Sequence, residues 1–347
     1  MPPDLAVVGG GPVGLVAALH AARRGLSVTV VEPRTGPIDK ACGEGIMPAG
    51  VAQLDELGVR PRGHPIRAIT YRDERGGAAT APLAGRSGLG VRRTVLHEAL
   101  LEALAPGVEI LHDHVVGLAQ DGTGVDLRLR AGGVLRAGHV VAADGLHSPT
   151  RRRLGLDRPS GARRRHGLRR HYRVGEVTDA VEVHWGSRAE AYLTPVDEGT
   201  LGIAVLSSDR SPFDEQLRQF PFLAVRLASA EPLDDVRGAG PLRQRSRRRV
   251  LGRVLLVGDA AGYVDALTGE GLTLGWRQAA AAVAAVADGV PGRYERDYLG
   301  IGAVGRTLTH GLVMVTRHDL VRGHLVTAAG RAQPLYRAAV RAAASGW

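Results

Sequence analysis

Residues 5–14 read LAVVGGGPVG, and this short stretch decides the fold. Its first four residues are apolar, which predicts a buried strand, and the spacing of small and apolar residues from Leu15 to Arg24 predicts a helix that ends at Gly25. The pattern between them is GxGxxG, which joins the first strand to the first helix of dinucleotide-binding folds. The stretch therefore predicts an α/β fold with a dinucleotide site.

The glycines of this pattern have separate mechanical roles. Gly9 permits the tight turn, Gly11 lets a pyrophosphate approach the backbone, and Gly14 allows the helix to pack closely on the strand. Pro12 lies at the start of the helix, where free N–H groups and the positive end of the helix dipole favour phosphate. We expect all four residues to contribute to cofactor binding.

A second predicted strand, Val28 to Val31, leads into Glu32, 18 residues after Gly14. An acid at this place accepts hydrogen bonds from both ribose hydroxyls and repels a 2′-phosphate. Arg34 belongs to the same predicted site. The complete unit of strand, glycine turn, helix, strand and acid is far more specific than GxGxxG alone, and it fits NAD and FAD equally well.

Three later motifs distinguish between these two cofactors. A strand-like run from His139 leads into Asp144-Gly145 and a DGxxSxxR pattern, a second run from Val254 leads into residues 258–262, GDAAG, and Gly269-Glu270-Gly271 opens a helix that reaches about Ala287. Together they resemble the flavoprotein monooxygenase superfamily, which includes aromatic hydroxylases, geranylgeranyl reductases and flavin halogenases. The resemblance implies FAD, bound by a Rossmann-like (GR2-type) domain with an inserted antiparallel-sheet substrate domain and a helical C-terminus.

The same resemblance implies a role for particular residues. Asp259 would accept hydrogen bonds from the ribityl chain, and Asp144 with Gly145 would lie near the pyrophosphate and an incoming NADPH or NADH. Arg93 matches an arginine that contacts the flavin phosphates or ribityl, or it is a solvated helix charge beside Arg92. The remaining implied cofactor residues are Val115 near adenine and, at the start of the helix that faces the flavin, Gly269, Glu270 and Gly271.

The loop from Lys40 to Pro48 is similar to the K-x-C-G motif of geranylgeranyl reductases. Cys42 and Gly43 would run along the flavin, and Cys42 is either a catalytic residue or a small packing residue. Glu44 and Glu270 are candidates for proton transfer if they are buried. Gly262 and Ala266 stand where many aromatic hydroxylases carry histidine and proline, which argues against the phenol hydroxylase branch.

The chain divides into four predicted segments. An FAD-binding domain covers 1–160 and contains a meander of strands at about 108–140, a substrate domain covers 161–250, the FAD-binding domain continues over 251–290, and 291–347 is helical. The substrate pocket is predicted to include Met47, Tyr192 and Pro195, although the core is the alternative place for these side chains. His310, His318 and His324 fall on no single helix face, so we expect no metal site.

Composition restricts the class of protein. The 347 residues carry 45 basic and 35 acidic side chains, a net charge of +10, and include one cysteine, which excludes an internal disulfide framework and a CxxC zinc cluster. Runs of arginine such as 151–153, 163–165 and 247–249 are interpreted mainly as solvated surface, with a subset near Asp144 that attracts NADPH. Aromatic residues form only 4% of the chain, so we expect no nucleic-acid partner.

The amino terminus lacks the basic and apolar regions of a signal peptide, and no apolar stretch is long enough to span a bilayer. The sequence therefore predicts a cytoplasmic protein without a transmembrane segment, with peripheral membrane contact left open.

The sequence favours an NAD(P)H-dependent FAD monooxygenase that uses molecular oxygen and a flavin C4a-hydroperoxide to hydroxylate an apolar aromatic or polyketide-type compound. The first alternative is a reductase of prenyl chains, which the Lys40–Gly45 loop favours and the missing aromatic Y-x-W-x-F-P motif disfavours; the nearest match is 192–195, YLTP. Halogenation is disfavoured because no tryptophan-rich motif is found. A flavin-binding sensor or nucleic-acid-binding flavoprotein is the non-enzymatic alternative.

Overall fold

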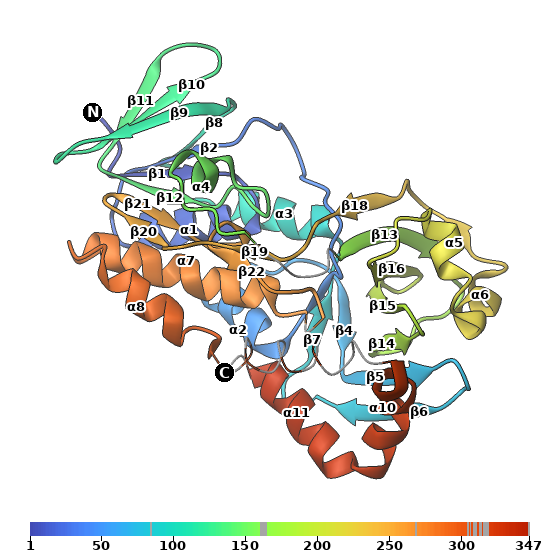
Figure 1. The fold of residues 1–347 in the computed structure, drawn as a ribbon. Coiled ribbons are helices and arrows are strands. Elements are labelled where there is room, and N and C mark those ends of the chain that lie inside the picture. The colour runs from blue at the N-terminus through green and yellow to red at the C-terminus, as the bar shows by residue number, and fades with distance from the viewer. Residues whose placement is uncertain are drawn as a thin grey trace.

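The computed structural model describes residues 1–83, 85–159, 165–267, 269–303, 305, 307, 311, 314 and 319–345. Two large sheets organise these residues, and Figure 1 shows them on opposite sides of the molecule, joined through a central region of loops and short strands. One sheet is mainly parallel and the other mainly antiparallel, as the sequence predicted for a Rossmann-like domain with an added substrate sheet.

The first sheet has six strands in the order β20-β21-β12-β1-β2-β8. Pairs between neighbours are parallel except for β20 with β21. The central strands β1 and β2 are buried on both faces, which accounts for their continuous apolar sequences. The strand bounds are β1 Leu5–Val8, β2 Val28–Val31, β8 Val108–Leu111, β12 His139–Ala142, β20 Val250–Leu251 and β21 Val254–Leu256.

Helices cover one face of this sheet and a small meander covers the other. The helices are α1, Pro12–Arg23, α3, Arg93–Glu102, and α7, Gly271–Ala287, whose apolar sides join the main core with Leu5, Val7 and Val30. The meander strands contribute Val125 and Leu127 to a second core against Ala6 and Val8. The sheet is therefore buried between two layers.

The meander consists of β9 Val115–Gln120, β10 Val125–Leu129 and β11 Val134–Ala137. The sequence prediction placed 108–111 in this meander, and that assignment is wrong, because β8 pairs in parallel with β2 at the edge of the large sheet. An apolar strand of four residues fits either environment, and sequence alone does not choose its partner.

The second sheet has eight strands. Seven follow the order β17-β13-β16-β15-β14-β5-β6, and β18 pairs with β13. β5 and β6 come from residues 68–82, which the sequence analysis did not assign to strands, and β5 joins β14 in parallel. The bounds are β5 Ala68–Asp73, β6 Ala78–Pro82, β13 His166–Arg173, β14 Ala180–Trp185, β15 Ala189–Asp197, β16 Thr200–Ser207, β17 Glu231–Pro232 and β18 Arg237–Ala239.

Two short helices, α5 Phe213–Leu217 and α6 Pro221–Leu227, pack on one side of this sheet through Phe213, Leu223 and their neighbours. The two helices are separate because Pro221 cannot donate a backbone hydrogen bond and instead begins the second helix.

The region between the sheets contains the remaining short elements. A three-stranded sheet of β3 Gly45–Ile46, β7 Gly88–Gly90 and β4 His64–Ile66 lies beside α2, Pro48–Glu56. The other short elements of this region are α4 Pro149–Arg153, β19 Gln244–Arg245, the 3₁₀ turn η1 Gly258–Ala260 and β22 Gly262–Tyr263.

The C-terminal part is helical, as predicted, with α8 Arg293–Gly300, α10 Asp319–Arg331 and α11 Gln333–Ser345. Tyr336 and Val340 of α11 pack against the second sheet, and the Tyr336 hydroxyl donates to the Ile69 carbonyl at 3.0 Å. His310 and His318 lie outside the described residues. Among the described residues, no helix has the length and apolarity to cross a membrane, and no His, Cys, Asp and Glu cluster could hold a metal ion.

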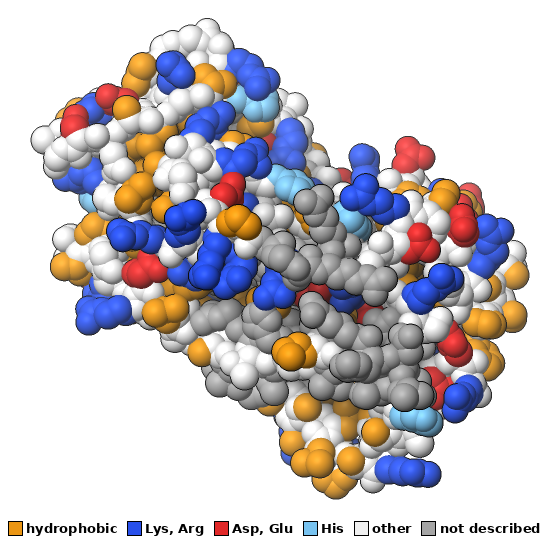
Figure 2. Space-filling model, in the orientation of Figure 1, with side chains coloured by type: hydrophobic (Ala, Val, Ile, Leu, Met, Phe, Trp, Pro, Cys, Tyr) orange, Lys and Arg blue, Asp and Glu red, His pale blue; other side chains and the backbone are white. Residues whose placement is uncertain are grey.

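Basic side chains are spread over much of the face in Figure 2, mixed with hydrophobic and acidic ones. Arg152, Arg153, Arg247 and Arg248 are exposed. Arg151 belongs to the first run but is only 1% exposed, so the interpretation as solvated surface does not hold for it.

Candidate functional site

Two adjoining cavities lie at the carboxyl ends of the parallel strands, where ligands bind in open α/β sheets. The smaller has a volume of about 180 Å³, and the larger has about 1460 Å³ and extends onto the second sheet. Five residues line both cavities, so the two cavities adjoin along a shared wall: Gly11, Lys40, Arg93, Ala143 and Asp144.

Side chains at two positions of the glycine turn, Gly9 and Gly14, would clash with the backbone. Gly9 has a φ of +102°, and a Cβ on it would lie 2.7 Å from the Ala143 carbonyl oxygen. A Cβ on Gly14 would lie 1.9 Å from the Gly9 carbonyl oxygen. His97 of α3 supports the turn from beneath, because its Nε2 lies 2.8 Å from the Gly10 carbonyl oxygen. The backbone at the start of α1 is therefore held open to the cavities.

Glu32 follows β2 and lines the smaller cavity. Its carboxylate accepts hydrogen bonds from the Gly10 N–H at 2.8 Å and from Arg34 Nε at 2.7 Å. Burial raises the pKa of Glu32, but the hydrogen bonds from Arg34 and Gly10 outweigh that effect and lower it overall. Glu32 is therefore an ionised acceptor at the place where a ribose would lie. Val115 lies on the same cavity wall.

Asp144 and Asp259 come from two neighbouring strands, β12 and β21, and both line the larger cavity. Asp144 Oδ2 accepts from the Thr150 N–H at 2.9 Å, whereas its buried Oδ1 has no hydrogen-bond partner within the described part of the chain. A buried acceptor of this kind is costly without a ligand donor. Together with the open glycine turn, it fits a cofactor that carries hydroxyl groups and phosphates.

Cations surround the Asp259 carboxyl. Burial raises its pKa, and the charges of Lys40, Arg93 and Arg151 oppose that rise. Burial also lowers the pKa of Lys40, as do Arg34 and Arg93, while Asp259 raises it. Since Lys40 lines both cavities, it brings a positive charge to their junction, where a pyrophosphate would be neutralised.

Arg151 connects the two aspartate loops. Its guanidinium donates to the carbonyl oxygens of Leu146, Asp259 and Ala260 at 3.0 to 3.2 Å and pairs with Asp157 at 2.5 Å. The sequence pattern DGxxSxxR included this arginine, but its structural use was not predicted. The contact fixes the loop after β12 relative to the turn after β21.

The loop from Lys40 to Gly45 forms one wall of the larger cavity. Burial raises the pKa of the Cys42 thiol, which disfavours the thiolate that nucleophilic catalysis requires. Glu44 is 3% exposed, and both carboxylate oxygens have partners, the Arg93 N–H at 2.9 Å and His171 Nε2 at 2.6 Å. These contacts give Glu44 a structural use that the sequence did not reveal.

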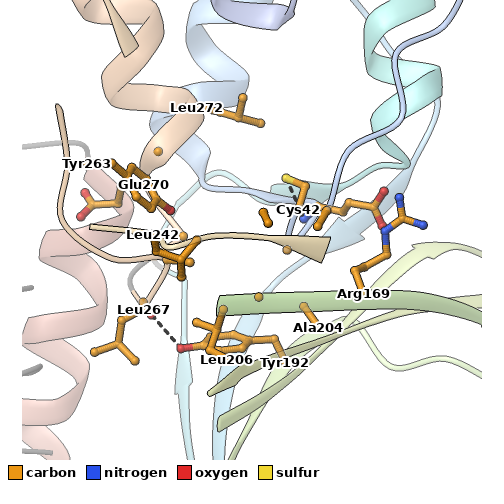
Figure 3. A pocket seen from close by; sticks show the side chains of 18 of the residues that line it. Cys42, Arg169, Tyr192, Ala204, Leu206, Leu242, Tyr263, Leu267, Glu270 and Leu272 are labelled. Atoms are coloured by element: carbon orange, nitrogen blue, oxygen red, sulfur yellow. Dashed lines mark hydrogen bonds between the residues drawn. The ribbon is translucent and has the colours of Figure 1, made fainter. Parts of the chain in front are cut away.

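The floor of the larger cavity is one face of the second sheet. One cross-strand row runs over five strands in register and lines the cavity throughout: Arg169, Ala204, Tyr192, Val183 and Tyr71. Four strand spacings correspond to about 19 Å. Figure 3 shows Tyr192, Ala204 and Leu206 on this floor, with Cys42 and Leu272 across the space above them.

The loop before α7, with Gly269 and Glu270, and the first residue of α7, Gly271, form the opposite wall. The Tyr192 hydroxyl donates to the Leu267 carbonyl at 3.1 Å, so the floor holds this loop directly, as the dashed line in Figure 3 shows. Arg165 forms a second link, since it pairs with Glu190 of β15 and with Asp265 at 3.3 Å.

The structure brings most of the sequence-predicted site residues together around these cavities. Gly9, Glu32, Arg34 and Val115 line the smaller one, and Gly14 lies behind the turn. Pro195 does not line either cavity, and Thr194 takes the corresponding place on the floor. The larger cavity or both are lined by Gly11, Pro12, Cys42, Gly43, Met47, Arg93, Asp144, Gly145, Tyr192, Asp259, Gly269, Glu270 and Gly271.

Sequence comparison finds a family model described as "FAD binding domain", which matches residues 3–299. The chain is 36% identical to 3-amino-4-hydroxybenzoate 2-monooxygenase of Streptomyces platensis over 178 residues, which cover 45% of this chain and 43% of that enzyme. It is also 30% identical to menaquinone reductase of Mycolicibacterium smegmatis over 304 residues, 78% of this chain and 73% of the reductase.

Among solved structures, a flavoprotein/dehydrogenase from Cytophaga hutchinsonii superposes with a TM-score of 0.84 at 18% identity, covering 99% of this chain and 93% of the other. At this identity the likeness shows a shared fold. The same two-sheet architecture therefore occurs in a solved flavoprotein.

Proposed function

The chain belongs to the FAD binding domain family, and on that premise we propose that it is an NAD(P)H-dependent FAD monooxygenase acting on an apolar aromatic or polyketide-type small molecule. The observation that carries the proposal is the lining of the larger cavity, where motif residues for the cofactor, such as Asp144 and Asp259, and an apolar face of the second sheet border the same space. A cofactor and an apolar substrate would meet there.

The residues around the two cavities fit FAD. The glycine turn would accept the pyrophosphate beside Lys40 and Arg93, Glu32 would accept from the adenosine ribose, and Asp259 would accept from the ribityl hydroxyls. The unpartnered Asp144 Oδ1 would gain a donor. When bound, FAD supplies two-electron redox chemistry, which includes oxidation of a nicotinamide and activation of oxygen.

The protein would support that chemistry in two ways. The amino terminus of α7 directs N–H groups and the positive end of its dipole toward the cavity, which favours negative charge on a reduced ring. The apolar floor around Val183, Leu206 and Tyr192 would exclude water from the reacting centre. Without water, a reactive oxygen species is less prone to decay before it reacts with the substrate.

The size of the larger cavity supports a sizeable apolar substrate. Its volume, about 1460 Å³, exceeds the roughly 300–1,000 Å³ of ordinary ligand pockets, so it has room for a flavin ring and a second molecule. The floor presents mainly Val, Leu, Ala and Tyr side chains. These surfaces favour flat or extended apolar molecules, which would be held by burial of apolar surface and by contact with aromatic rings.

The test begins with the purified protein and its absorbance spectrum. Bound flavin, or flavin taken up from added FAD, is expected, and its absence would contradict the proposal. NADPH and NADH oxidation is then followed in air with aromatic and polyketide compounds. Substrate-dependent oxygen consumption with a product heavier by one oxygen atom supports a monooxygenase.

A second candidate function is reduction of a double bond in a prenyl chain. It is favoured by the Lys40–Gly45 loop and by the match to menaquinone reductase over 78% of this chain. The same assay distinguishes the two functions, because a reductase would turn over without oxygen and yield a product heavier by two hydrogen atoms.

A further inference from the structure

We propose that His171 is a positioning residue that fixes the flavin-facing loop, residues 39–45, to the second sheet by holding the buried carboxylate of Glu44. This inference rests on the proposed use of the larger cavity as a flavin site. The loop lines that cavity with Lys40, Cys42 and Gly43, so its conformation decides what the cofactor would meet.

Glu44 occupies a backbone conformation that needs external support. Its φ of +58° makes it the one non-glycine residue with a positive φ among those the structure describes. Such a conformation is disfavoured for a residue with a long side chain and persists when surrounding contacts determine it. The backbone supplies some support, since the Glu44 carbonyl accepts from the Val91 N–H at 2.9 Å.

The carboxylate supplies the rest. One oxygen accepts from the Arg93 N–H at the start of α3, where negative charge is favoured by the helix dipole. The other lies 2.6 Å from His171 Nε2. The Glu44 and His171 side chains are each 1% exposed, so neither group has water as a substitute partner.

His171 is itself held on its other side. Its Nδ1 lies 2.6 Å from Asp234 Oδ2, and its backbone N–H donates to Asp234 Oδ1 at 2.9 Å. Arg169, two residues earlier on β13, donates to the same aspartate at 2.7 Å and pairs with Asp39 at the start of the loop. The ring is thus oriented by the sheet before it meets Glu44.

The loop is attached to the sheet at three places. Arg169 holds Asp39 at one end, His171 holds Glu44 at the other, and the Thr194 hydroxyl donates to the Gly43 carbonyl at 2.7 Å between them. Cys42 lies between these attachments, and its Sγ accepts a hydrogen bond from the Glu44 N–H at 3.4 Å. Loss of the His171 contact should therefore move Cys42.

The molecule contains a matched control. His184 on β14 is also a buried histidine beside a buried glutamate, with its Nε2 3.3 Å from Glu182 Oε2. Neither residue of this pair lines the cavities. A change that acts only through general stability should affect both histidines, whereas a change that acts on the loop should be specific to His171.

The experiment uses Cys42 as a reporter, because it is the sole cysteine of the chain. The apoprotein is treated with a thiol-reactive dye, and FAD is separately titrated by flavin fluorescence. We expect His171→Ala to label about tenfold faster and to bind FAD about tenfold more weakly, as expected for loss of a hydrogen bond to a charged group. His184→Ala should lower the melting temperature and leave both readouts unchanged.

Two conservative variants test the geometry. The amide of His171→Gln reaches the position of Nε2 and should restore slow labelling, whereas His171→Asn reaches only that of Nδ1 and should not. If His171→Ala does not fold, Thr194→Val removes the central attachment and should accelerate labelling more mildly. Unchanged labelling in folded His171→Ala, or equal acceleration in His184→Ala, would overturn the proposal.

Failure of the inference and failure of the proposed function give different results. Labelling of the apoprotein reports the loop without flavin, so it remains informative if no FAD binds. Slow labelling in every His171 variant would reject the positioning role even in a protein that binds FAD normally.

Discussion

The two sheets present their functional residues in different ways. The parallel sheet offers them at strand ends: Glu32 follows β2, Asp144 follows β12, and Asp259 follows β21. The antiparallel sheet offers them from the middle of strands, as one face that includes Tyr192 and Val183. The first arrangement suits phosphates and sugars, which meet backbone N–H groups and acids, and the second suits a broad apolar molecule.

This difference predicts that substitutions in the two sheets will have different effects. Changes at the strand ends of the parallel sheet should reduce cofactor binding, and changes on the face of the antiparallel sheet should affect stability or substrate while FAD is retained. The following four substitutions test that separation.

The largest effect is expected from Gly14→Ala. The added Cβ would lie 1.9 Å from the Gly9 carbonyl oxygen, and backbone atoms on both sides cannot yield without opening the turn. We expect loss of FAD from the purified protein and a destabilisation of about 3 kcal/mol or more. Gly107→Ala is the control, because a Cβ there meets nothing within 4 Å. Normal flavin content in Gly14→Ala would show that the turn does not contribute to FAD binding.

The next effect concerns Glu182 in the antiparallel sheet, whose side chain is only 5% exposed. Burial raises its pKa, but His184, Arg226 and Arg72 outweigh this and hold the pKa at about 2, compared with 4.5 in an unfolded chain. A lowered folded pKa stabilises the protein above pH 4.5, and this contribution, about 3 kcal/mol, is lost as the pH falls from 4.5 toward 2.

Urea unfolding at pH 7 and pH 3 measures this contribution. Glu182→Gln should be less stable at pH 7 and should lose less stability on acidification than the unsubstituted protein. FAD content should be unaffected at pH 7, since Glu182 lies outside the cavities. Parallel pH curves for the two proteins would show that the carboxylate makes no such contribution.

A smaller effect is expected from Asp259→Asn, at the end of β21. The carboxylate would lose its charge-assisted hydrogen bonds to the ribityl hydroxyls, and FAD affinity should fall by about tenfold to a hundredfold. Asp126→Asn is the control, because Asp126 lies on β10 and lines neither cavity. Fluorescence titration with FAD provides the measurement, and equal affinities for the two variants would rule out the proposed contact.

The smallest effect is expected from Tyr192→Phe, on the floor of the larger cavity. It removes the hydrogen bond to the Leu267 carbonyl and keeps the ring, at a cost of about 1 kcal/mol. We expect KM for an accepted substrate to rise about fivefold with FAD affinity unchanged. If FAD affinity fell and KM did not rise, Tyr192 would contribute to cofactor binding and not to substrate binding.

The same contrast explains what could be predicted from the sequence. The strand-end residues lie in contiguous motifs, since a strand, a turn and a helix start follow one another directly along residues 5–14. Glu32, Asp144 and Asp259 could be identified for that reason, and they do line the cavities. Their parallel strands were also recognised by their continuous apolar sequences.

The face of the antiparallel sheet could not be predicted in this way. Which residues face the cavity depends on the register between strands distant in sequence, such as β5 with β14 and β14 with β15. Pro195 was assigned to the pocket with the core as the alternative place, and alternation along β15 places Thr194 on the cavity while Pro195 is buried. The contact of His171 with Glu44 spans 127 residues and leaves no local pattern.

Lys40 has a practical consequence for chemical work on this protein. It is the single lysine among 45 basic residues, and it lies at the junction of the two cavities. Amine-directed coupling to a sensor surface or bead would therefore attach the chain either through its amino terminus or across its cofactor site. If added FAD protects Lys40 from such reagents, the extent of its modification reports directly whether the ligand is bound.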